Sequence, residues 1–233
     1  MPFDALSDLN TEHKPWPSVI ENNLTMFIEF QLNCRIICQE LLAALSTTII
    51  TNGALPFESS HRDRKLSTSS LAMLKYPPTI DLDKRNTGHM AHTDVGSLTL
   101  LFTYAPGLEI YRASTSTWVS VPPQPGCALV NVGDTLSFLS GMQLKSCLHI
   151  VVPVEGHVRF SLAYFHRPEL EAQFVDGSGR RWTGEAWHRA KYQTFRAENV
   201  EQSSTSLLTG RYNFLGHVEN EEDIGSQSNT SDT

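Results

Sequence analysis

Apolar residues follow a helical spacing near the start of the chain. Between residues 18 and 50 they recur at steps of three and four positions, as in Leu24, Phe27 and Ile28. Such spacing gathers the apolar side chains on one side of a helix. We therefore predict one long helix that packs against a larger body, preceded by an irregular, polar lead-in over residues 1–17.

The pattern changes between Leu71 and Pro168. Short apolar runs alternate there with turn residues at intervals of about 8–12 positions, which is typical of an all-β sandwich or barrel. The runs read SLTLLF, GLEIY, WVSV, ALVNV, TLSFL, HIVVPV and RFSLAYF. Elsewhere, residues 52–70 are polar and predict a loop, and residues 180–200 return to a helical pattern. The tail from Glu219 is acidic and rich in Ser and Asn, so we expect it to be disordered.

The overall composition narrows the functional classes. The net charge is −7, with 18 basic and 25 acidic residues. Nucleic acids and anionic membranes select for basic surfaces, so we expect neither partner. No apolar run approaches the roughly 18 residues of a transmembrane helix, and the first residues lack the basic start and apolar core of a secretory signal. The four cysteines form no CxxC pair, so we expect free thiols in a cytoplasmic protein.

A metal site is predicted from two segments. His92-Thr93-Asp94 leads directly into a strand-like run, and side chains two apart in a strand point to the same face. His149 opens a later strand-like run. Two histidines and one carboxylate leave three positions open on Fe(II), which suits the binding of an oxo acid followed by O2.

The His-x-Asp spacing alone is weak evidence, because short motifs of this kind arise by chance. The chain contains a second copy, His61-Arg62-Asp63, which lies in a polar loop with no strand to orient it. We interpret His61 and Asp63 as solvated loop residues.

An arginine and a serine share one face of the last strand-like run, RFSLAYF. Arg159 and Ser161 are two positions apart, and Phe160 and Leu162 take the opposite face. A guanidinium pairs bidentately with a carboxylate, and a hydroxyl adds one donor. The pair could hold the distal carboxylate of a five-carbon dicarboxylate whose other end chelates the metal. The alternative is an exposed edge strand with Arg159 facing water.

Taken together, these residues resemble the iron- and 2-oxoglutarate-dependent dioxygenases of the isopenicillin N synthase-like family, over roughly Leu74 to Pro168. The matching segments, in chain order, are Tyr76-Pro77-Pro78, His92-Thr93-Asp94, Leu98-Thr99-Leu100-Leu101, Gly107-Leu108-Glu109-Ile110, Trp118-Val119-Ser120-Val121, Asn131-Val132-Gly133-Asp134, Lys145-Ser146-Cys147-Leu148-His149 and Arg159-Phe160-Ser161-Leu162-Ala163-Tyr164-Phe165. An ordered series of this kind is more specific than any single motif.

The resemblance implies a mainly β fold with flanking helices, namely a double-stranded β-helix or jelly roll. It implies that Fe(II) is held by His92, Asp94 and His149. It also implies that the distal carboxylate of 2-oxoglutarate is bound by Arg159, Ser161 and Tyr76. For the tyrosine an alternative is a half-buried aromatic that anchors the turn before the prolines. O2 would be the second co-substrate, and ascorbate could support turnover.

On this basis we divide the chain into four parts. Residues 1–70 would form an N-terminal helical segment and loop, residues 71–168 the jelly-roll domain, residues 169–218 a C-terminal helical segment, and residues 219–233 a disordered tail.

Some features depart from the family pattern. Relatives commonly carry a longer N-terminal region, which completes part of the sheet and one wall of the substrate pocket. Ile150 stands where an arginine commonly follows the distal histidine, and Leu74 stands where asparagine is common. We expect the metal and oxo-acid residues to be preserved, whereas the substrate pocket could be incomplete.

The expected activity is oxidation of a small organic molecule in specialised-metabolite biosynthesis, by hydroxylation or desaturation. One alternative is a truncated, catalytically impaired relative that binds metal and serves as a non-enzymatic subunit. Another is a cupin-like metal isomerase or binding module, and a third is a relative that uses no oxo acid. Dependence on 2-oxoglutarate separates the predicted enzyme from the last two.

Overall fold

The structure is a computed structural model that describes residues 16–49, 55–77, 91–152, 156, 158–196 and 207. The helices are α2 (Ser18–Glu21), α3 (Leu24–Thr48), the 3-10 helix η1 (Phe57–Ser60), α4 (Asp134–Leu139) and α5 (Gly184–Arg196). The strands are β1 (Ser70–Tyr76), β2 (Leu98–Thr103), β3 (Leu108–Arg112), β4 (Thr117–Val121), β5 (Leu129–Val132), β6 (His149–Val151), β7 (Arg159–His166), β8 (Gln173–Val175) and β9 (Arg181–Thr183).

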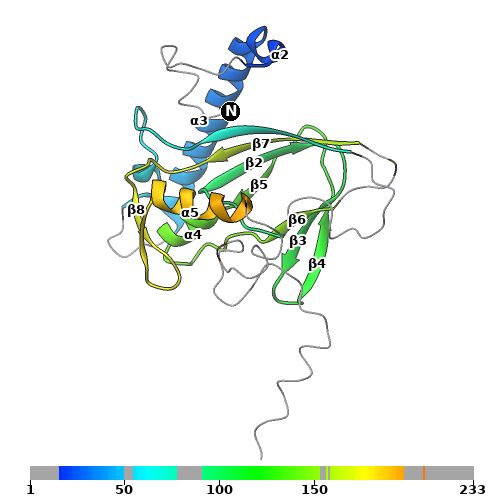
Figure 1. Cartoon of the computed structure of the whole chain (residues 1–233). Helices are drawn as coiled ribbons and strands as arrows, with labels where there is room; N and C mark the ends of the chain where they lie inside the picture. The colour runs from blue at the N-terminus through cyan, green and yellow to red at the C-terminus, as the bar shows by residue number, and fades with distance from the viewer. Residues whose placement is uncertain are drawn as a thin grey trace, which may run out of the picture.

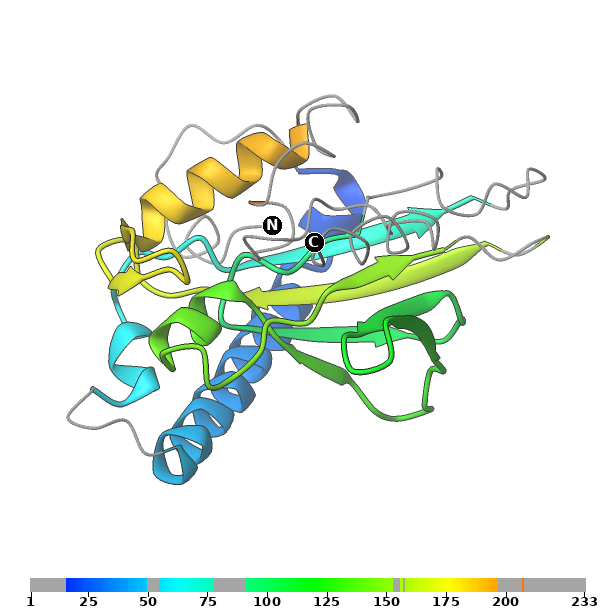
Figure 2. The same cartoon turned by 90° about the horizontal axis from the view of Figure 1, so that it is seen from below.

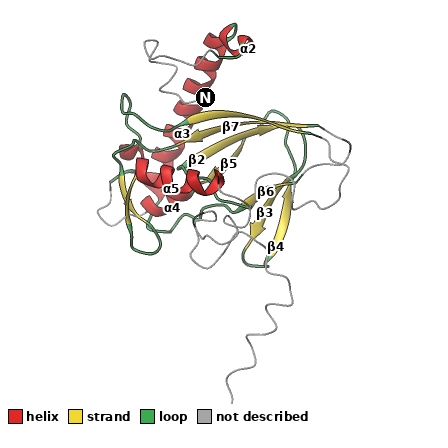
Figure 3. Cartoon of the chain, viewed as in Figure 1, coloured by secondary structure: helices red, strands yellow, loops and turns green. Residues whose placement is uncertain are grey.

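Two antiparallel sheets form the body of the molecule (Figure 1). The larger sheet has four strands in the order β1-β7-β2-β5, and the smaller has three in the order β4-β3-β6. A third sheet is the β8-β9 hairpin. Helices gather around the larger sheet, as Figure 3 shows by colour. The predicted mainly β architecture with flanking helices is therefore confirmed.

The predicted N-terminal helix is present, with one interruption. Asn22 and Asn23 separate α2 from α3, and the Asn23 side chain donates to the carbonyl of Val19 over 2.8 Å. Asparagine competes in this way for backbone groups and favours breaks in a helix. The four cysteines are free, as expected.

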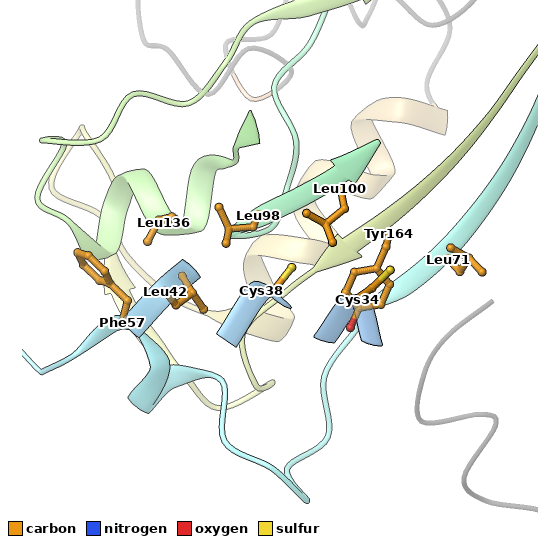
Figure 4. Close-up of a cluster of buried hydrophobic side chains, with 9 residues drawn as sticks. All are labelled: Cys34, Cys38, Leu42, Phe57, Leu71, Leu98, Leu100, Leu136 and Tyr164. Atoms are coloured by element: carbon orange, nitrogen blue, oxygen red, sulfur yellow. The ribbon is translucent and has the colours of Figure 1, made fainter. Parts of the chain in front are cut away.

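The main hydrophobic core lies between α3 and the outer face of the larger sheet (Figure 4). The buried residues of α3 follow each other at steps of three and four, as the sequence pattern requires. The core comprises Cys34, Cys38, Leu42, Phe57, Leu71, Leu98, Leu100, Leu136 and Tyr164. The other face of the sheet points toward α5, and Figure 2 shows α3 and α5 on opposite sides of it.

One predicted strand is a helix. The run TLSFL belongs to α4, which begins at Asp134 after Gly133. Residues 134–138 are all buried, so the run shows no alternation that would distinguish a strand from a short buried helix. The helical pattern predicted for residues 180–200 likewise begins later, because residues 181–183 form β9 and pair with β8.

The second His-x-Asp segment agrees with the prediction at Asp63 but not at His61. His61 is buried, with 2% of its surface exposed, whereas the Asp63 side chain is exposed and pairs with Arg35 at 2.8 Å. Nδ1 of His61 lies 2.8 Å from the carbonyl of Phe57, which can only accept, so Nδ1 carries the proton and Nε2 accepts from Ser97 Oγ at 2.7 Å. The interpretation of His61 as a solvated residue is therefore wrong.

The buried histidines predict that stability falls in mild acid. His61 stacks on His166 with ring centroids 4.9 Å apart. Burial lowers the pKa of His61 from 6.5 to about 4. Burial, together with the charges of His61 and Arg35, also lowers the pKa of His166 well below 6.5. Both rings are therefore neutral when folded and bind a proton on unfolding, so stability present above pH 6.5 is lost as pH falls toward 4.

Urea unfolding measured between pH 7 and pH 5 checks this prediction. Each histidine is expected to lower the free energy of unfolding by up to about 1.4 kcal/mol per pH unit. Burial also lowers the pKa of His188 to about 4, so His166→Phe removes one of three such rings that the structure describes. Its pH slope should therefore be smaller than that of the wild type by up to about 1.4 kcal/mol per pH unit over this window. Equal slopes for the two proteins would contradict the explanation.

Several predictions concern residues outside the described ranges, namely most of the polar lead-in and the whole of the acidic tail. Within the described residues, no helix has the length and apolar character needed to cross a membrane.

Candidate metal centre and oxo-acid site

Backbone pairing brings the two predicted ligand segments together. The His92 N–H donates to the carbonyl of His149 over 3.0 Å, and the reverse bond measures 2.9 Å. The two residues form an isolated bridge, and β2 begins only at Leu98. The first ligand segment therefore precedes the strand instead of opening it, and its extended conformation is held by pairing with residue 149.

The carboxylate of Asp94 is oriented by two donors. Thr99 Oγ1 donates to Oδ2 over 2.6 Å and Asn131 Nδ2 donates to the same oxygen over 2.8 Å. Oδ1 is left facing the Nε2 atoms of His92 and His149, each 3.9 Å away. Burial raises the pKa of Asp94, but the two histidines and the two hydrogen bonds outweigh it and lower the pKa to about 2.

The three side chains therefore offer one ligand atom each to a shared point. These atoms lie within 4.8 Å of one another. Nδ1 of His149 lies 3.0 Å from the carbonyl of Cys147, which fixes the tautomer and leaves Nε2 free as a ligand. Two imidazoles and one monodentate carboxylate on one side of an ion form the facial arrangement typical of non-haem Fe(II). The donor set fits that metal.

A buried ion pair supports the ligand segment from behind. Lys191 of α5 donates to Asp134 of α4 and, over 2.6 Å, to the hydroxyl of Thr93 between the two ligands. Ser146 donates to the other oxygen of Asp134 over 2.6 Å. Lys191 and Asp134 are both fully buried. No local pattern in the sequence identifies Asp134 and Lys191 as partners, because their pairing depends on how two distant helices pack.

Two glycines let the chain approach itself closely beside the ligands. A Cβ on Gly133 would lie 2.3 Å from the carbonyl oxygen of Gly96, and a Cβ on Gly96 would lie 2.6 Å from that of His166. The Asp134 N–H can therefore donate to the carbonyl of Asp94 over 2.8 Å. The Asn131-Val132-Gly133-Asp134 segment thus packs directly against the metal segment.

Arg159 is buried on a central strand of the larger sheet. It is 1% exposed, so the alternative of an edge strand with this residue in water is wrong. Nε donates to the carbonyl of Pro106 over 3.2 Å and Nη1 donates to Ser161 Oγ over 3.2 Å. Nη2 is buried without a hydrogen-bond partner among the described residues. A charged donor left open in this way fits an incoming carboxylate.

Tyr76 lies opposite Arg159 in the pairing of β1 with β7. The guanidinium carbon lies 5.1 Å from the centroid of the tyrosine ring. Burial raises the pKa of Tyr76, and the charge of Arg159 opposes that shift. The three predicted oxo-acid residues are therefore neighbours. Phe160, on the other face, is 61% exposed, as the alternation predicts.

The three metal residues and two of the oxo-acid residues, Tyr76 and Ser161, border one cavity of about 1030 Å3. Its wall combines residues of both sheets and of α5, and includes His92, Asp94, His149, Tyr76 and Ser161. Most of the remaining lining is apolar, with residues such as Leu74, Leu101 and Ile110. A cavity of this size accommodates a co-substrate and a small organic molecule together.

The chain is similar in sequence to known proteins. Residues 67–168 match the 2OG-Fe(II) oxygenase superfamily. The chain is 43% identical over 201 residues to the 2-oxoglutarate-dependent dioxygenase iboH of Amanita muscaria, covering 83% of this chain and 96% of that protein. It is 40% identical to the 2-oxoglutarate-dependent dioxygenase gloE of Glarea lozoyensis, covering 83% of this chain but 59% of that protein.

Solved structures agree on the fold. A full-length Neurospora crassa protein in complex with alpha-KG superposes with a TM-score of 0.62 at 24% identity, covering 78% of this chain and 62% of that one. JOX2 in complex with 2OG, Fe and JA gives a TM-score of 0.61 at 21% identity, and the match covers 82% of this chain and 56% of JOX2. These likenesses confirm the double-stranded β-helix. On its motifs, fold and relatives, the chain belongs to the 2OG-Fe(II) oxygenase superfamily, whose members are oxidoreductases that use Fe(II), 2-oxoglutarate and O2.

Proposed function

We propose that this chain is an Fe(II)- and 2-oxoglutarate-dependent oxygenase that hydroxylates or desaturates a small organic molecule. One observation carries the proposal. Three ligand atoms converge within 4.8 Å on the wall of a cavity that also contains Ser161 and Tyr76, with the open guanidinium of Arg159 beside them. A diacid that chelates a metal with one end and pairs with a guanidinium at the other would use both groups.

Each residue has a distinct task in this proposal. His92, Asp94 and His149 would hold Fe(II), and Arg159 and Ser161 would bind the distal carboxylate of 2-oxoglutarate. The bound metal and oxo acid supply the oxidising chemistry, coupling O2 activation to release of CO2 and succinate. The protein positions these groups, and its apolar cavity wall keeps water away from the reacting centre.

The substrate class is supported by the relatives. Another structure of the Neurospora crassa protein contains thymine, JOX2 was solved with JA, and a rice protein is described as a dioxygenase for auxin oxidation. The cavity of this chain, with its largely apolar lining, is suited to a small organic substrate.

The short N-terminal region does not by itself favour the non-enzymatic alternative. The chain spans about three-fifths of the length of gloE, which is 59% covered, but nearly all of iboH, which is 96% covered. A protein of matching extent therefore carries the name of a dioxygenase. Membership of the superfamily also argues against the cupin-like alternative.

Anaerobic titration of the purified chain with Fe(II) and 2-oxoglutarate tests the proposal. A visible charge-transfer band of the chelate is expected only when both are present. On admission of O2, slow succinate formation should follow even without a substrate. Arg159→Met is expected to weaken 2-oxoglutarate binding by about tenfold or more, because a charge-assisted pair is lost. A chain that binds iron but shows neither the band nor succinate would refute the proposed function.

A further inference from the structure

A second buried arginine borders the cavity, at the other end of β7 from Arg159. Alternate residues of this strand face the cavity, and Ser161, Ala163, Phe165 and Arg167 all line it. Arg167 directly follows the strand and is 6% exposed. Its guanidinium carbon lies 5.0 Å from the centroid of the Phe165 ring. The cavity-facing side of one strand therefore carries an arginine at each end.

Arg167 has no carboxylate partner in the described part of the chain. Its Nη1 donates to the carbonyl of Thr68 and to Ser70 Oγ, the latter over 2.9 Å. Its buried Nε has no hydrogen-bond partner among the same residues. Burial lowers the pKa of Arg167 to about 10, so the guanidinium stays charged at neutral pH. The charge of Asp94 also acts on Arg167, but the two side chains form no ion pair. A buried guanidinium with an unused donor and no carboxylate in contact is costly, which indicates that an anion enters the cavity.

The arginine lies on the metal side of the cavity. A Cβ on Gly96, two residues after Asp94, would lie 2.7 Å from Cγ of Arg167. His188 and Tyr192 of α5 interact electrostatically with Arg167 and also line the cavity. The distal carboxylate of 2-oxoglutarate is assigned to Arg159, at the far end of the strand. An anion other than that carboxylate must therefore pair with the guanidinium of Arg167.

We propose that Arg167 binds a carboxylate of the substrate, so that the enzyme acts on small carboxylic acids held between α5 and the metal triad. This inference rests on the proposed function, because it assumes that 2-oxoglutarate fills the Arg159 end. Thr68 and Ser70 hold one edge of the guanidinium and leave another edge to the ligand. Pairing with the carboxylate would fix which substrate carbon faces the metal.

Matched pairs of acids and amides provide the test. The protein is loaded anaerobically with Fe(II) and saturating 2-oxoglutarate, and binding of hexanoate is compared with hexanamide, and phenylacetate with phenylacetamide, by calorimetry. The wild type is expected to bind at least one acid about tenfold more tightly than its amide. Arg167→Met should lose that preference, and Arg167→Lys should retain part of it because the charge remains. Arg189→Met, on the exposed side of α5, should behave as the wild type.

The outcomes separate the two hypotheses. If 2-oxoglutarate does not bind to the wild type, the proposed function fails. If it binds, but neither acid is preferred over its amide, the assignment of Arg167 is overturned. The assignment is also overturned if Arg167→Met keeps the preference, or if it weakens 2-oxoglutarate binding itself by about tenfold, since the anion held there would then be the co-substrate. We expect 2-oxoglutarate affinity within about twofold of the wild type in this variant.

Discussion

Asp94→Asn is expected to abolish 2-oxoglutarate turnover while leaving the chain folded. The substitution keeps the size of the side chain but removes the charge that balances the metal. It also permits rotation that turns an amide nitrogen, which is no ligand, toward the two histidines. Loss of a residue that merely orients a ligand costs about 10–100-fold in metal affinity or activity, so loss of the ligand itself should exceed that range.

Two further variants make the experiment specific. Asp63→Asn makes the same change in the other His-x-Asp segment, where the side chain is 84% exposed, and should leave succinate formation unaltered. Thr99→Val removes one of the two hydrogen-bond donors to Asp94. Its metal affinity or activity should fall by about 10–100-fold, which lies between the results expected for Asp63→Asn and Asp94→Asn. Iron binding and succinate release are measured for all three. Full turnover in Asp94→Asn, or equal loss in Asp63→Asn, would reject the metal assignment.

The local patterns in the sequence were sufficient to predict which residues at the start of β7 share a face. A strand alternates its faces, so Arg159 and Ser161 had to point together and Phe160 away, and a charge in an apolar run required a counter-ion. The grouping of His92, Asp94 and His149 came from the ordered resemblance, because no local rule brings residue 149 to residue 92. The structure shows that backbone pairing between the two segments does so.

Other features depend on packing that no local pattern records. His61 has the sequence surroundings of an exposed loop, yet it is buried because Ser97 and the carbonyl of Phe57 satisfy both of its nitrogens. Burial of both faces of α4 erased the periodicity that identifies a helix, so TLSFL resembled a strand. The unpaired donor of Arg167 could not be predicted from the sequence, because it depends on which neighbouring groups contact the guanidinium in the folded chain.

Lys191→Met is expected to lower the free energy of unfolding by about 3–5 kcal/mol, because it leaves the buried carboxylate of Asp134 without its counter-ion. Burial disfavours the charged lysine and lowers its pKa, and the charge of Asp134 opposes that shift. The same lysine donates to Thr93 between two metal ligands. Activity should therefore fall together with stability.

A double variant separates the ion pair from packing. Lys191→Met combined with Asp134→Asn removes both charges, and it should recover part of the lost stability, because no uncompensated charge remains. Arg189→Met breaks only the exposed pair with Glu185 on the same helix, so it should change the free energy of unfolding by less than about 1 kcal/mol. Urea denaturation of the wild type and these three variants at pH 7 gives the comparison. Lys191→Met could instead lower the free energy of unfolding by no more than Arg189→Met does. In that case the Lys191–Asp134 pair does not hold α5 on the metal segment, and the contact of Lys191 with Thr93 does not support that segment.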